Sequence, residues 1–296
     1  MIDAKVICDS VSESGVRLTT IQARIHRFIL PEITRHRMFS FSVRSSRAVP
    51  TSKLVDEVVN DPALPVYWGK NRRGMSADEE IEQIEGDGGI KTWWIAVAER
   101  AAEEAHQMQV TLGLHKQIVN RVIEPYQWCD LIVSGTEWDN FFNLRLAADA
   151  QPEIQEVARK MKEVMDKSTP EVLRPGQWHL PYVSPYDEDG NPSFYSDPTV
   201  AIKCSAARCA RVSYGNHDGS EPDVEKDLKL YDFLVSSGHL SPLEHQATPM
   251  LNYISDRVND TSPTTWEPGV SHIDKNYSLW SGTLREWIQY RKLVDI

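Results

Sequence analysis

The amino-acid sequence predicts an α+β protein, with a helical middle whose long core helices pack on a small, mainly antiparallel sheet. Residues 16–25 alternate apolar and polar side chains as a half-buried strand does. Between residues 92 and 165, apolar side chains recur three and four positions apart, which is the spacing of a buried helix face. Residues 201–214 again favour a strand. Together these patterns indicate separate helical and sheet-forming regions.

The remaining elements follow from local signals. Residues 26–39 predict a short helix, and the Ser-rich residues 40–52 predict a loop. A short helical piece is expected at residues 54–61. Longer helices are then expected at residues 92–108, 114–124, 126–133 and 135–146, and Pro152 restarts the apolar stripe as far as residue 165.

Prolines divide the chain into three regions. Residues 1–168 are expected to form the helical core with the Arg-rich loop, and residues 169–198, which hold six prolines, a crossover. Residues 199–296 are expected to pack into the same domain. Within that last region, a helix is predicted over residues 226–238 and another over the tail, residues 276–294.

Composition excludes several classes of protein. The net charge of −11 argues against general nucleic-acid binding. No apolar run approaches the roughly 18 residues that a membrane span needs. The start of the chain lacks the basic and apolar regions of a signal peptide. Four scattered cysteines without a C-x-x-C pair predict free thiols in a reducing compartment, so we expect a cytoplasmic protein without membrane partners.

One stretch reverses the overall acidity. Residues 17–47 contain seven arginines and no lysine, against Glu32 alone. Guanidinium groups favour bidentate recognition of phosphate or carboxylate, so this stretch predicts an anion pocket; a solvated basic face is the plainer alternative.

The sharpest local pattern is Arg35-His36-Arg37, followed by Ser45, Ser46 and Arg47. On a helix end, three consecutive residues fan around roughly 200°, so they line a wall where two ligands meet rather than grip one small ligand. Hydroxyl and backbone N–H groups of the Ser-rich loop are of the kind that cradle phosphate oxygens.

Several segments resemble motifs of the flavin-dependent thymidylate synthases (ThyX). The R-H-R triplet with Ser45 resembles R-H-R-x7-S. Further matches are residues 120–125 with A-R-x-x-L-P, residues 140–145 and 150–154 with N-F-x-N-L-R…A-Q-x-E-I, residues 206–214 with the A-A-R-x-C-Y strand, and residues 238–245 with G-H-x-[ST]-P-x-E-H. The layout resembles the longer form of the family found in some bacteriophages. It departs from the common short form, in which the last motif precedes R-H-R.

The resemblance implies an α+β homotetramer with active sites between subunits. It implies FAD as cofactor, NADPH as reductant and methylenetetrahydrofolate as the donor of a one-carbon unit to C5 of dUMP, giving dTMP. It assigns catalytic roles to Arg35, His36 and Arg145. It assigns cofactor binding to Arg35, His36, Arg37, Asn140, His239, Ser241 and Glu244, and nucleotide binding to Ser45, Arg47, Arg121 and Arg145. No metal is implied.

Departures from the family pattern leave the substrate open. Asp149 stands where the family has a histidine, and Ser134 where it has an asparagine. A hydroxymethylase acting on dCMP or dUMP is therefore a second candidate. A conventional thymidylate synthase needs a nucleophilic cysteine thiolate. Cys129, in the apolar helix expected at residues 126–133, is more typical of packing.

Two other functions compete with this interpretation. A metal hydrolase could use His239, Glu244 and His245, but their spacing does not give the two histidines one helical turn apart that zinc sites favour. A non-catalytic nucleic-acid binder could combine the arginines with stacking on tryptophans. The tryptophans at issue lie at helix-core spacing, which favours packing: Trp93, Trp94 and Trp138.

Overall fold

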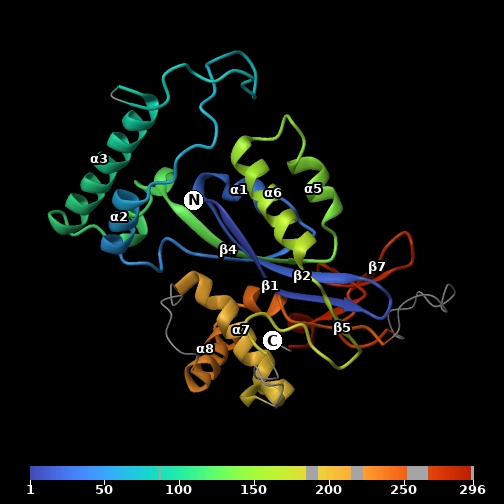
Figure 1. Ribbon diagram of the computed structural model, residues 1–296. Coiled ribbons are helices and arrows are strands. Elements are labelled where there is room, and N and C mark those ends of the chain that lie inside the picture. The colour runs from blue at the N-terminus through green and yellow to red at the C-terminus, as the bar shows by residue number, and fades with distance from the viewer. Residues whose placement is uncertain (87, 185–192, 215–222, 252–265, 295–296) are drawn as a thin grey trace.

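The computed structural model describes residues 1–86, 88–184, 193–214, 223–251 and 266–294, and its centre is a five-stranded sheet (Figure 1). The strand order is β3-β4-β2-β1-β5. All neighbours are antiparallel except β1 and β5, which run parallel. The strands are β1 (Asp3–Ser12), β2 (Arg17–His26), β3 (Ser40–Val43), β4 (Trp128–Gly135) and β5 (Glu171–Leu173). The predicted α+β class with a mainly antiparallel sheet is confirmed.

Helices cover both faces of this sheet (Figure 1). On one face lie α5 (Asp139–Arg145) and α6 (Pro152–Lys167), and on the other α7 (Pro198–Tyr214) and α8 (Val224–Ser236). The side chains of strand β4 pack against helices on both faces of the sheet. Leu131 and Val133 belong to the core beneath α6, whereas Ile132 between them packs against Cys209 and Val212 of α7. Successive strand side chains point to opposite faces, so β4 is apolar throughout.

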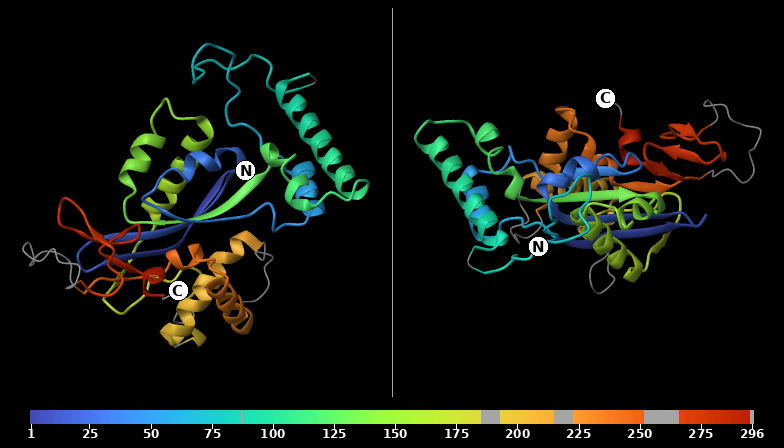
Figure 2. Two further views of the ribbon diagram at one scale, coloured as in Figure 1. Left: turned by 180° about the vertical axis from the view of Figure 1, so that it is seen from behind. Right: turned by 90° about the horizontal axis from the view of Figure 1, so that it is seen from above.

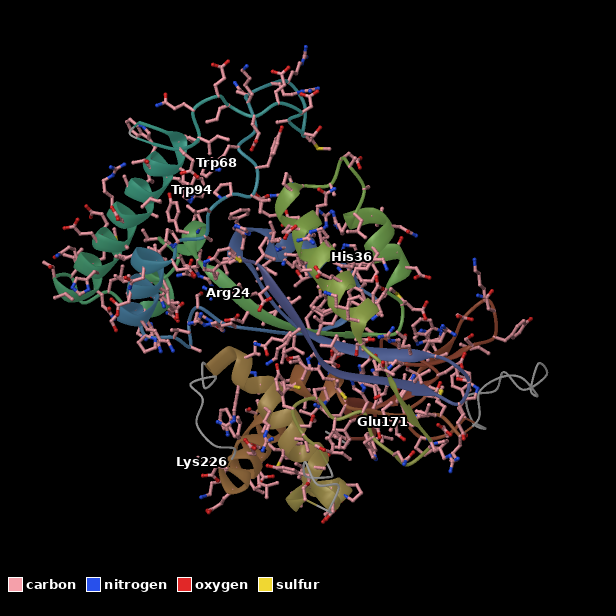
Figure 3. The ribbon with its side chains drawn as sticks, viewed as in Figure 1. Arg24, His36, Trp68, Trp94, Glu171 and Lys226 are labelled. Atoms are coloured by element: carbon pink, nitrogen blue, oxygen red, sulfur yellow. The ribbon has the colours of Figure 1, made fainter. Side chains whose placement is uncertain are left out.

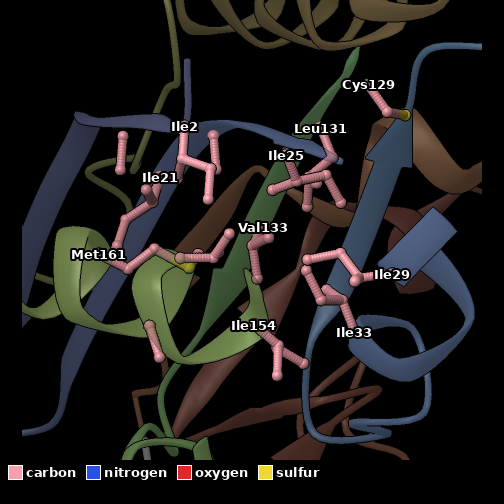
Figure 4. Close-up of a cluster of buried hydrophobic side chains, with 14 of the residues drawn as sticks. Ile2, Ile21, Ile25, Ile29, Ile33, Cys129, Leu131, Val133, Ile154 and Met161 are labelled. Atoms are coloured by element: carbon pink, nitrogen blue, oxygen red, sulfur yellow. The ribbon is translucent and has the colours of Figure 1, made fainter. Parts of the chain in front are cut away.

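A hydrophobic core fills the space between the sheet and α6 (Figure 4). Ile21 and Ile25 of β2 meet Ile154, Val157 and Met161 of α6 there. Each such fully buried side chain contributes about 1.5–3 kcal/mol relative to an exposed one. The strand predicted at residues 16–25 and the helix predicted after Pro152 are both confirmed.

A separate group of helices lies to one side of the sheet (Figures 1 and 2). It consists of α2 (Thr51–Asn60), α3 (Ile90–Val110) and α4 (Lys116–Val119). The long helix α3 buries an alanine stripe against α2 and α4. Helix α3 therefore packs on other helices, whereas the sequence predicted that the long helices pack on the sheet. The helix expected at residues 114–124 is shorter than predicted, since α4 gives way to turns and to the 3-10 helix η2 (Glu124–Tyr126).

Three predicted helices or strands were wrong, and the first four residues of the loop expected at residues 40–52 form strand β3. Most of residues 126–133 lie in strand β4, which begins at Trp128, rather than in a helix, because an unbroken apolar run buried on both faces has no period that distinguishes a strand from a helix. Residues 201–214 lie in helix α7 rather than a strand. Their small buried side chains, such as Ala201, Cys204 and Ala207, recur at helical spacing.

The tail is the third error, since residues 276–294 form short strands and not a helix. Gly282 and Glu286 both have positive φ, which turns the chain where a helix would continue. The strands of this region are β6 (Ala247–Pro249), β7 (His272–Ile273), β8 (Leu279–Ser281), β9 (Leu284–Arg285) and β10 (Trp287–Gln289), followed by the 3-10 helix η7 (Tyr290–Leu293). Strand β1 was not predicted; it carries a bulge between Val6 and Cys8, which interrupts its alternation.

The described parts of the Pro-rich crossover contain β5 and the 3-10 helix η3 (Phe194–Ser196), and its residues 185–192 lie outside the described residues. The helix predicted at residues 226–238 is confirmed as α8, which ends at Ser236, and Gly238 just after it has a positive φ of 74°. None of the helices in the described ranges combines the length and the apolar composition of a membrane span.

Candidate functional site

The R-H-R triplet lies in a pair of turns between helix and strand. The predicted helix ends early: the 3-10 helix η1 (Arg27–Ile29) and the single turn of α1 (Leu30–Ile33) stop before Arg35. The backbone N–H of His36 then donates to Ile33 at 3.1 Å. Arg35 and Arg37 are exposed, while His36 turns inward. The triplet therefore presents two cations outward and one imidazole to the core.

The turn is held by an aromatic cluster on α5. The His36 ring meets Phe141 edge-on, with centroids 4.9 Å apart. Phe39 packs against Phe141 and Trp138 on the same side. Gly135 is required here, because a Cβ at that position would overlap the Phe39 ring. His36 accordingly lies on the α5 and α6 side of the sheet (Figure 3).

His36 and Arg145 form the contact that joins two distant motifs. Arg145 ends α5, and its Nε lies 2.8 Å from Nε2 of His36. A guanidinium has no acceptor, so Nε2 of His36 accepts this hydrogen bond and the ring carries its proton on Nδ1. Burial, and then the charge of Arg145, lower the pKa of His36. The imidazole is thus neutral at neutral pH.

Arg145 also lines a cavity of about 890 Å³. The walls come from the start of α6, from the turn that contains Asp149, and from residues 66–77. The terminal nitrogens of Arg145 form no hydrogen bond or ion pair with the residues that the structure describes. The cavity is large enough for a drug-sized ligand.

The Ser-rich loop is organised by a buried amide. Asn120, fully buried, donates from Nδ2 to the carbonyls of Ser46 at 2.7 Å and Val49 at 3.2 Å. Its Oδ1 accepts from the hydroxyl of Thr51 at 2.7 Å. The sequence analysis assigned a role to Arg121 and not to its neighbour Asn120. A polar residue at the end of an apolar helix could have indicated that Asn120 is buried and hydrogen-bonded.

Glu124 joins this loop to Arg121. The Ser46 hydroxyl donates to Glu124 Oε1 at 2.9 Å, and Arg121 pairs with the same oxygen at 2.6 Å. Arg27 approaches it at 3.4 Å. Ser45 and Arg47 form no side-chain hydrogen bond or ion pair within the described chain, and Arg47 is exposed. Ser45 and Arg47 are thus available to a ligand, and Arg121 is partly neutralised.

The seven arginines of residues 17–47 do not form one pocket. Four of them pair with carboxylates: Arg17 with Asp9, Arg24 with Asp61, Arg27 with Glu124 and Arg44 with Glu57. Arg35, Arg37 and Arg47 have no ion pair in the described part of the chain. The anion-binding capacity that the composition predicted is therefore restricted to these three residues.

The C-terminal motif lies against β3, the strand that follows R-H-R. His239 and Ser241 line a cavity of about 300 Å³ with Phe41, Ser42 and Val43. Glu244 ends the 3-10 helix η4 (Ser241–Glu244) and pairs with Arg291 at 3.1 Å. Burial raises the pKa of Glu244. This packing brings the C-terminal motif next to the strand that follows R-H-R, although about two hundred residues separate the two motifs in the sequence.

Strand β3 separates the site residues into groups. His36, with Arg145 bonded to it, lies at the end where β3 begins, and Ser45 and Arg47 follow its last residue. Four residues of strand span roughly 13 Å, so the two groups lie at opposite ends of β3. Asn140 is exposed on α5, on the His36 side.

The family model of the thymidylate synthase complementing proteins (Thy1) matches residues 16–171, just over half of the chain. The chain belongs to this family. Membership confirms the prediction of an enzyme, a flavin-dependent methyltransferase of the thymidylate synthase type. No protein of curated function matches the chain.

Two solved structures illustrate what this Thy1 protein resembles. Flavin-dependent thymidylate synthase from Helicobacter pylori, complexed with FAD and dUMP, is 19% identical with a TM-score of 0.35, over 50% of this chain and 67% of that one. A UMP/dUMP methylase from Streptomyces cacaoi, bound with 5-Br UMP, is 18% identical with a TM-score of 0.41, over 56% and 89%. Similarity at this level transfers no ligand.

The thiols of this Thy1 protein are not activated. All four cysteines are free. Burial raises the pKa of Cys129, and it raises that of Cys8 to about 12. Cys204 and Cys209 shift in the same direction for the same reason. The prediction that Cys129 packs rather than reacts agrees with its burial, although the element is a strand.

The competing functions lose support from the same geometry. Both ring nitrogens of buried His245 bond to serines, whereas His239 is exposed, and the described residues contain no cluster of three metal-ligating side chains. Trp138 is buried and Trp94 donates to the Ala63 carbonyl, as packing predicts. Trp93 is exposed. One exposed tryptophan does not form a stacking platform.

Proposed function

We propose that this Thy1 protein transfers a one-carbon unit from methylenetetrahydrofolate to C5 of dUMP, giving dTMP, with FAD as cofactor and NADPH as reductant. The contact between His36 and Arg145 carries the proposal. It joins the R-H-R turn to the end of α5 at 2.8 Å, beside a cavity of about 890 Å³. We further infer that the chain is the longer, bacteriophage-type form and acts in the cytoplasm.

The residues at hand fit FAD. Arg35 and Arg37 are exposed cations without ion pairs in the described chain, which suits a diphosphate. Exposed His239 and Ser241, with Glu244, would add contacts along β3, and Asn140 would reach the ring from α5. When bound, FAD supplies hydride transfer, which removes the need for a cysteine nucleophile. All four thiols being unactivated agrees with that chemistry.

Arg145 would orient the pyrimidine. Its two terminal nitrogens can donate to the base oxygens, while Nε is held by His36. Donors placed in this way stabilise the negative charge on those oxygens that makes C5 nucleophilic toward the one-carbon unit. Ser45 and Arg47 would take the nucleotide phosphate, with Arg121 beside them. Neutral His36 holds the guanidinium in place without adding a competing charge.

Sites shared between subunits would resolve the separation across β3. We propose a homotetramer in which Arg47 of one protomer meets Arg145 of another, and a single domain in which residues 199–296 pack with residues 1–168. If so, mixing the Arg47→Ala and Arg145→Ala variants during refolding restores part of the activity, because some sites then receive both native residues. Inactive mixtures of correctly assembled protein would contradict shared sites.

Asp149 favours the second candidate, a hydroxymethylase, in the form that acts on dCMP. Its carboxylate lines the same cavity as Arg145 and forms no ion pair with the described residues. A carboxylate only accepts hydrogen bonds, so it suits the exocyclic amine of cytosine and opposes the O4 oxygen of uracil.

Turnover tests the proposal directly. The protein is incubated with NADPH, methylenetetrahydrofolate and either dUMP or dCMP, and the product is identified by mass. We expect dUMP to gain a methyl group. A hydroxymethyl product or a preference for dCMP that Asp149→Asn reverses would select the alternative. Flavin-loaded protein that modifies neither nucleotide would reject the reaction.

A further inference from the structure

A continuous chain of buried side-chain hydrogen bonds runs across four neighbouring strands of the sheet. It is made of six residues: Ser10, His179, Thr20, Ser134, His245 and Ser42. Taken in that order, the five donor–acceptor distances are 2.9, 2.8, 2.6, 2.8 and 2.9 Å. Every member is at most 4% exposed. A buried network of this kind is stable only if each group finds its partner.

The chain follows the order of the sheet. Its hydroxyls come from β1, β2, β4 and β3, which are successive neighbours. Its two imidazoles come from outside the sheet, His179 from the segment after β5 and His245 from the residue after η4. The backbones of these segments lie side by side, because His179 forms a β-bridge with Ala247.

The number of protons restricts how the chain can be arranged. Each hydroxyl has one hydrogen, and each neutral imidazole has one. Burial lowers the pKa of His179 and that of His245 to about 3, so both rings are neutral at neutral pH. Five bonds then need five of six hydrogens, and the sixth points outside the chain.

Only two arrangements leave no buried hydrogen unpaired. If Thr20 or Ser134 directed its hydrogen outside the chain, that hydrogen would face no acceptor among the described residues. The sixth hydrogen therefore belongs to Ser42 or to Ser10. In the first case both histidines carry their proton on Nε2, and in the second both carry it on Nδ1. The two tautomers are coupled.

Both ends of the chain open into cavities. Ser42 lines the cavity of about 300 Å³ that also contains His239 and Ser241. Ser10 lines a cavity of about 570 Å³ whose other walls include Trp178 and Tyr182. When Ser42 donates into its cavity, Ser10 donates to His179 and presents only acceptor lone pairs to its own cavity. In the other arrangement Ser42 presents only lone pairs to its cavity, and the hydrogen of Ser10 is free for a ligand or for the Cys8 thiol, which bonds Ser10 at the wall of the same cavity.

We propose that this chain is a two-state hydrogen-bond switch, through which an acceptor bound at Ser42 favours a donor bound at Ser10. The ligand at the Ser10 cavity would be a planar ring bearing an N–H donor, since aromatic side chains line that cavity. The switch itself does not depend on the proposed function; only the assignment of flavin to His239 and Ser241 does. The coupling needs two populated states with different ligand contacts, and the chain supplies both.

Nitrogen NMR of the whole, ligand-free protein labelled with ¹⁵N-histidine tests the switch, because Nδ1 and Nε2 shifts report the tautomer. His179 and His245 are expected to share one tautomer. Ser42→Ala removes the partner of His245 Nε2, so both rings should move toward Nδ1–H, by at least about tenfold in tautomer ratio. Ser10→Ala should move both toward Nε2–H.

Two controls isolate the chain. Ser40 lies on the same strand as Ser42, but its hydroxyl bonds Thr283 and Gln289. Ser40→Ala should therefore leave the tautomer of His179 unchanged. Adding Thr20→Val to Ser42→Ala breaks the chain at its middle and should cancel the response of His179. Opposite tautomers in the native protein, or a His179 that responds to neither end variant, would overturn the proposal. Ser10→Ala tests the same coupling if Ser42→Ala does not fold, and flavin binding plays no part in either readout.

Discussion

At the scale of single residues, the neutral state of His36 defines the character of the R-H-R turn. Burial and the charge of Arg145 both disfavour the imidazolium. The triplet therefore combines two exposed cations with one neutral hydrogen-bonding ring. A diphosphate beside an uncharged heterocycle matches that combination better than a phosphate alone.

Arg145→Ala should reduce nucleotide turnover by about 10²–10³-fold, because donors to the charge that develops on the base are lost. The fold should persist, since the side chain's described hydrogen bond is to His36 alone. Removing the charge should also raise the pKa of His36 in an NMR titration, while burial still holds it below the ordinary value.

Arg159→Ala is the matched control, because Arg159 lines the same cavity and already pairs with Glu156. Turnover in that variant should stay within about threefold of the native rate. Equal losses in both variants would mean that Arg145 has no special role.

Cys129→Ala should retain turnover within about twofold, because a buried thiol with a raised pKa is not a nucleophile. Thermal unfolding should show a loss of about 1 kcal/mol, from the cavity and from the lost contact with Arg27 at 3.3 Å. An inactive but folded variant would point to a conventional thiolate mechanism.

At the scale of elements, the loop after β3 depends on one amide. Asn120 connects the carbonyls of Ser46 and Val49 to the start of α2 at Thr51. The loop's exposed cation, Arg47, is thereby placed by a residue that contacts no ligand. Loss of such a buried group leaves several partners unsatisfied.

Asn120→Ala should lower the free energy of unfolding by about 2–3 kcal/mol and raise the Kd for the nucleotide by loosening the loop. Chemical denaturation and equilibrium titration measure the two effects. Asn60→Ala, at the exposed end of α2, removes only a bond to Asp56 and should change neither by much. Unaltered nucleotide affinity in folded Asn120→Ala would show that the loop does not bind the phosphate.

The elements predicted correctly were those with a clear period. The alternating residues of β2 and the apolar stripe of α6 each bury one face only, so the pattern identifies the element. Strand β4 and helix α7 are buried on more than one side, and this removes the pattern. Tertiary packing decides such segments.

The candidate site was predictable where motifs carry chemistry in the side chains. The contact between His36 and Arg145 unites two such motifs. What the sequence did not reveal are the groups that act through position, such as Asn120 and Glu124. It also did not reveal that four of seven clustered arginines are neutralised by carboxylates distant in sequence, such as Asp61 for Arg24.

At the scale of the whole molecule, a buried polar layer connects the sheet to the C-terminal region. His179 and His245 lie fully inside, each bonded to two hydroxyls. Ser134, in the middle of this layer, thus contributes to the fold rather than to a ligand. Burial of two neutral imidazoles makes stability depend on pH.

Stability should fall as the pH is lowered from about 6.5 toward 3. Both histidines have a folded pKa of about 3 and an ordinary value of 6.5, so the unfolded chain binds more protons in this range. Together they should cost about 3 kcal/mol per pH unit below pH 6. Urea unfolding at pH 7, 6 and 5 measures the slope.

The exposed His106 provides a control, since His106→Gln should leave that slope unchanged. Equal stability at pH 7 and pH 5 would contradict the burial of neutral histidines.

The visible absorbance spectrum of the purified protein, before and after addition of dUMP, tests the central claim most directly. A flavin site between the R-H-R turn and Arg145 predicts a yellow protein whose flavin band shifts when the nucleotide binds. The shift should be absent in Arg145→Ala, which should keep its colour. A colourless protein that takes up no flavin on reconstitution would contradict the account.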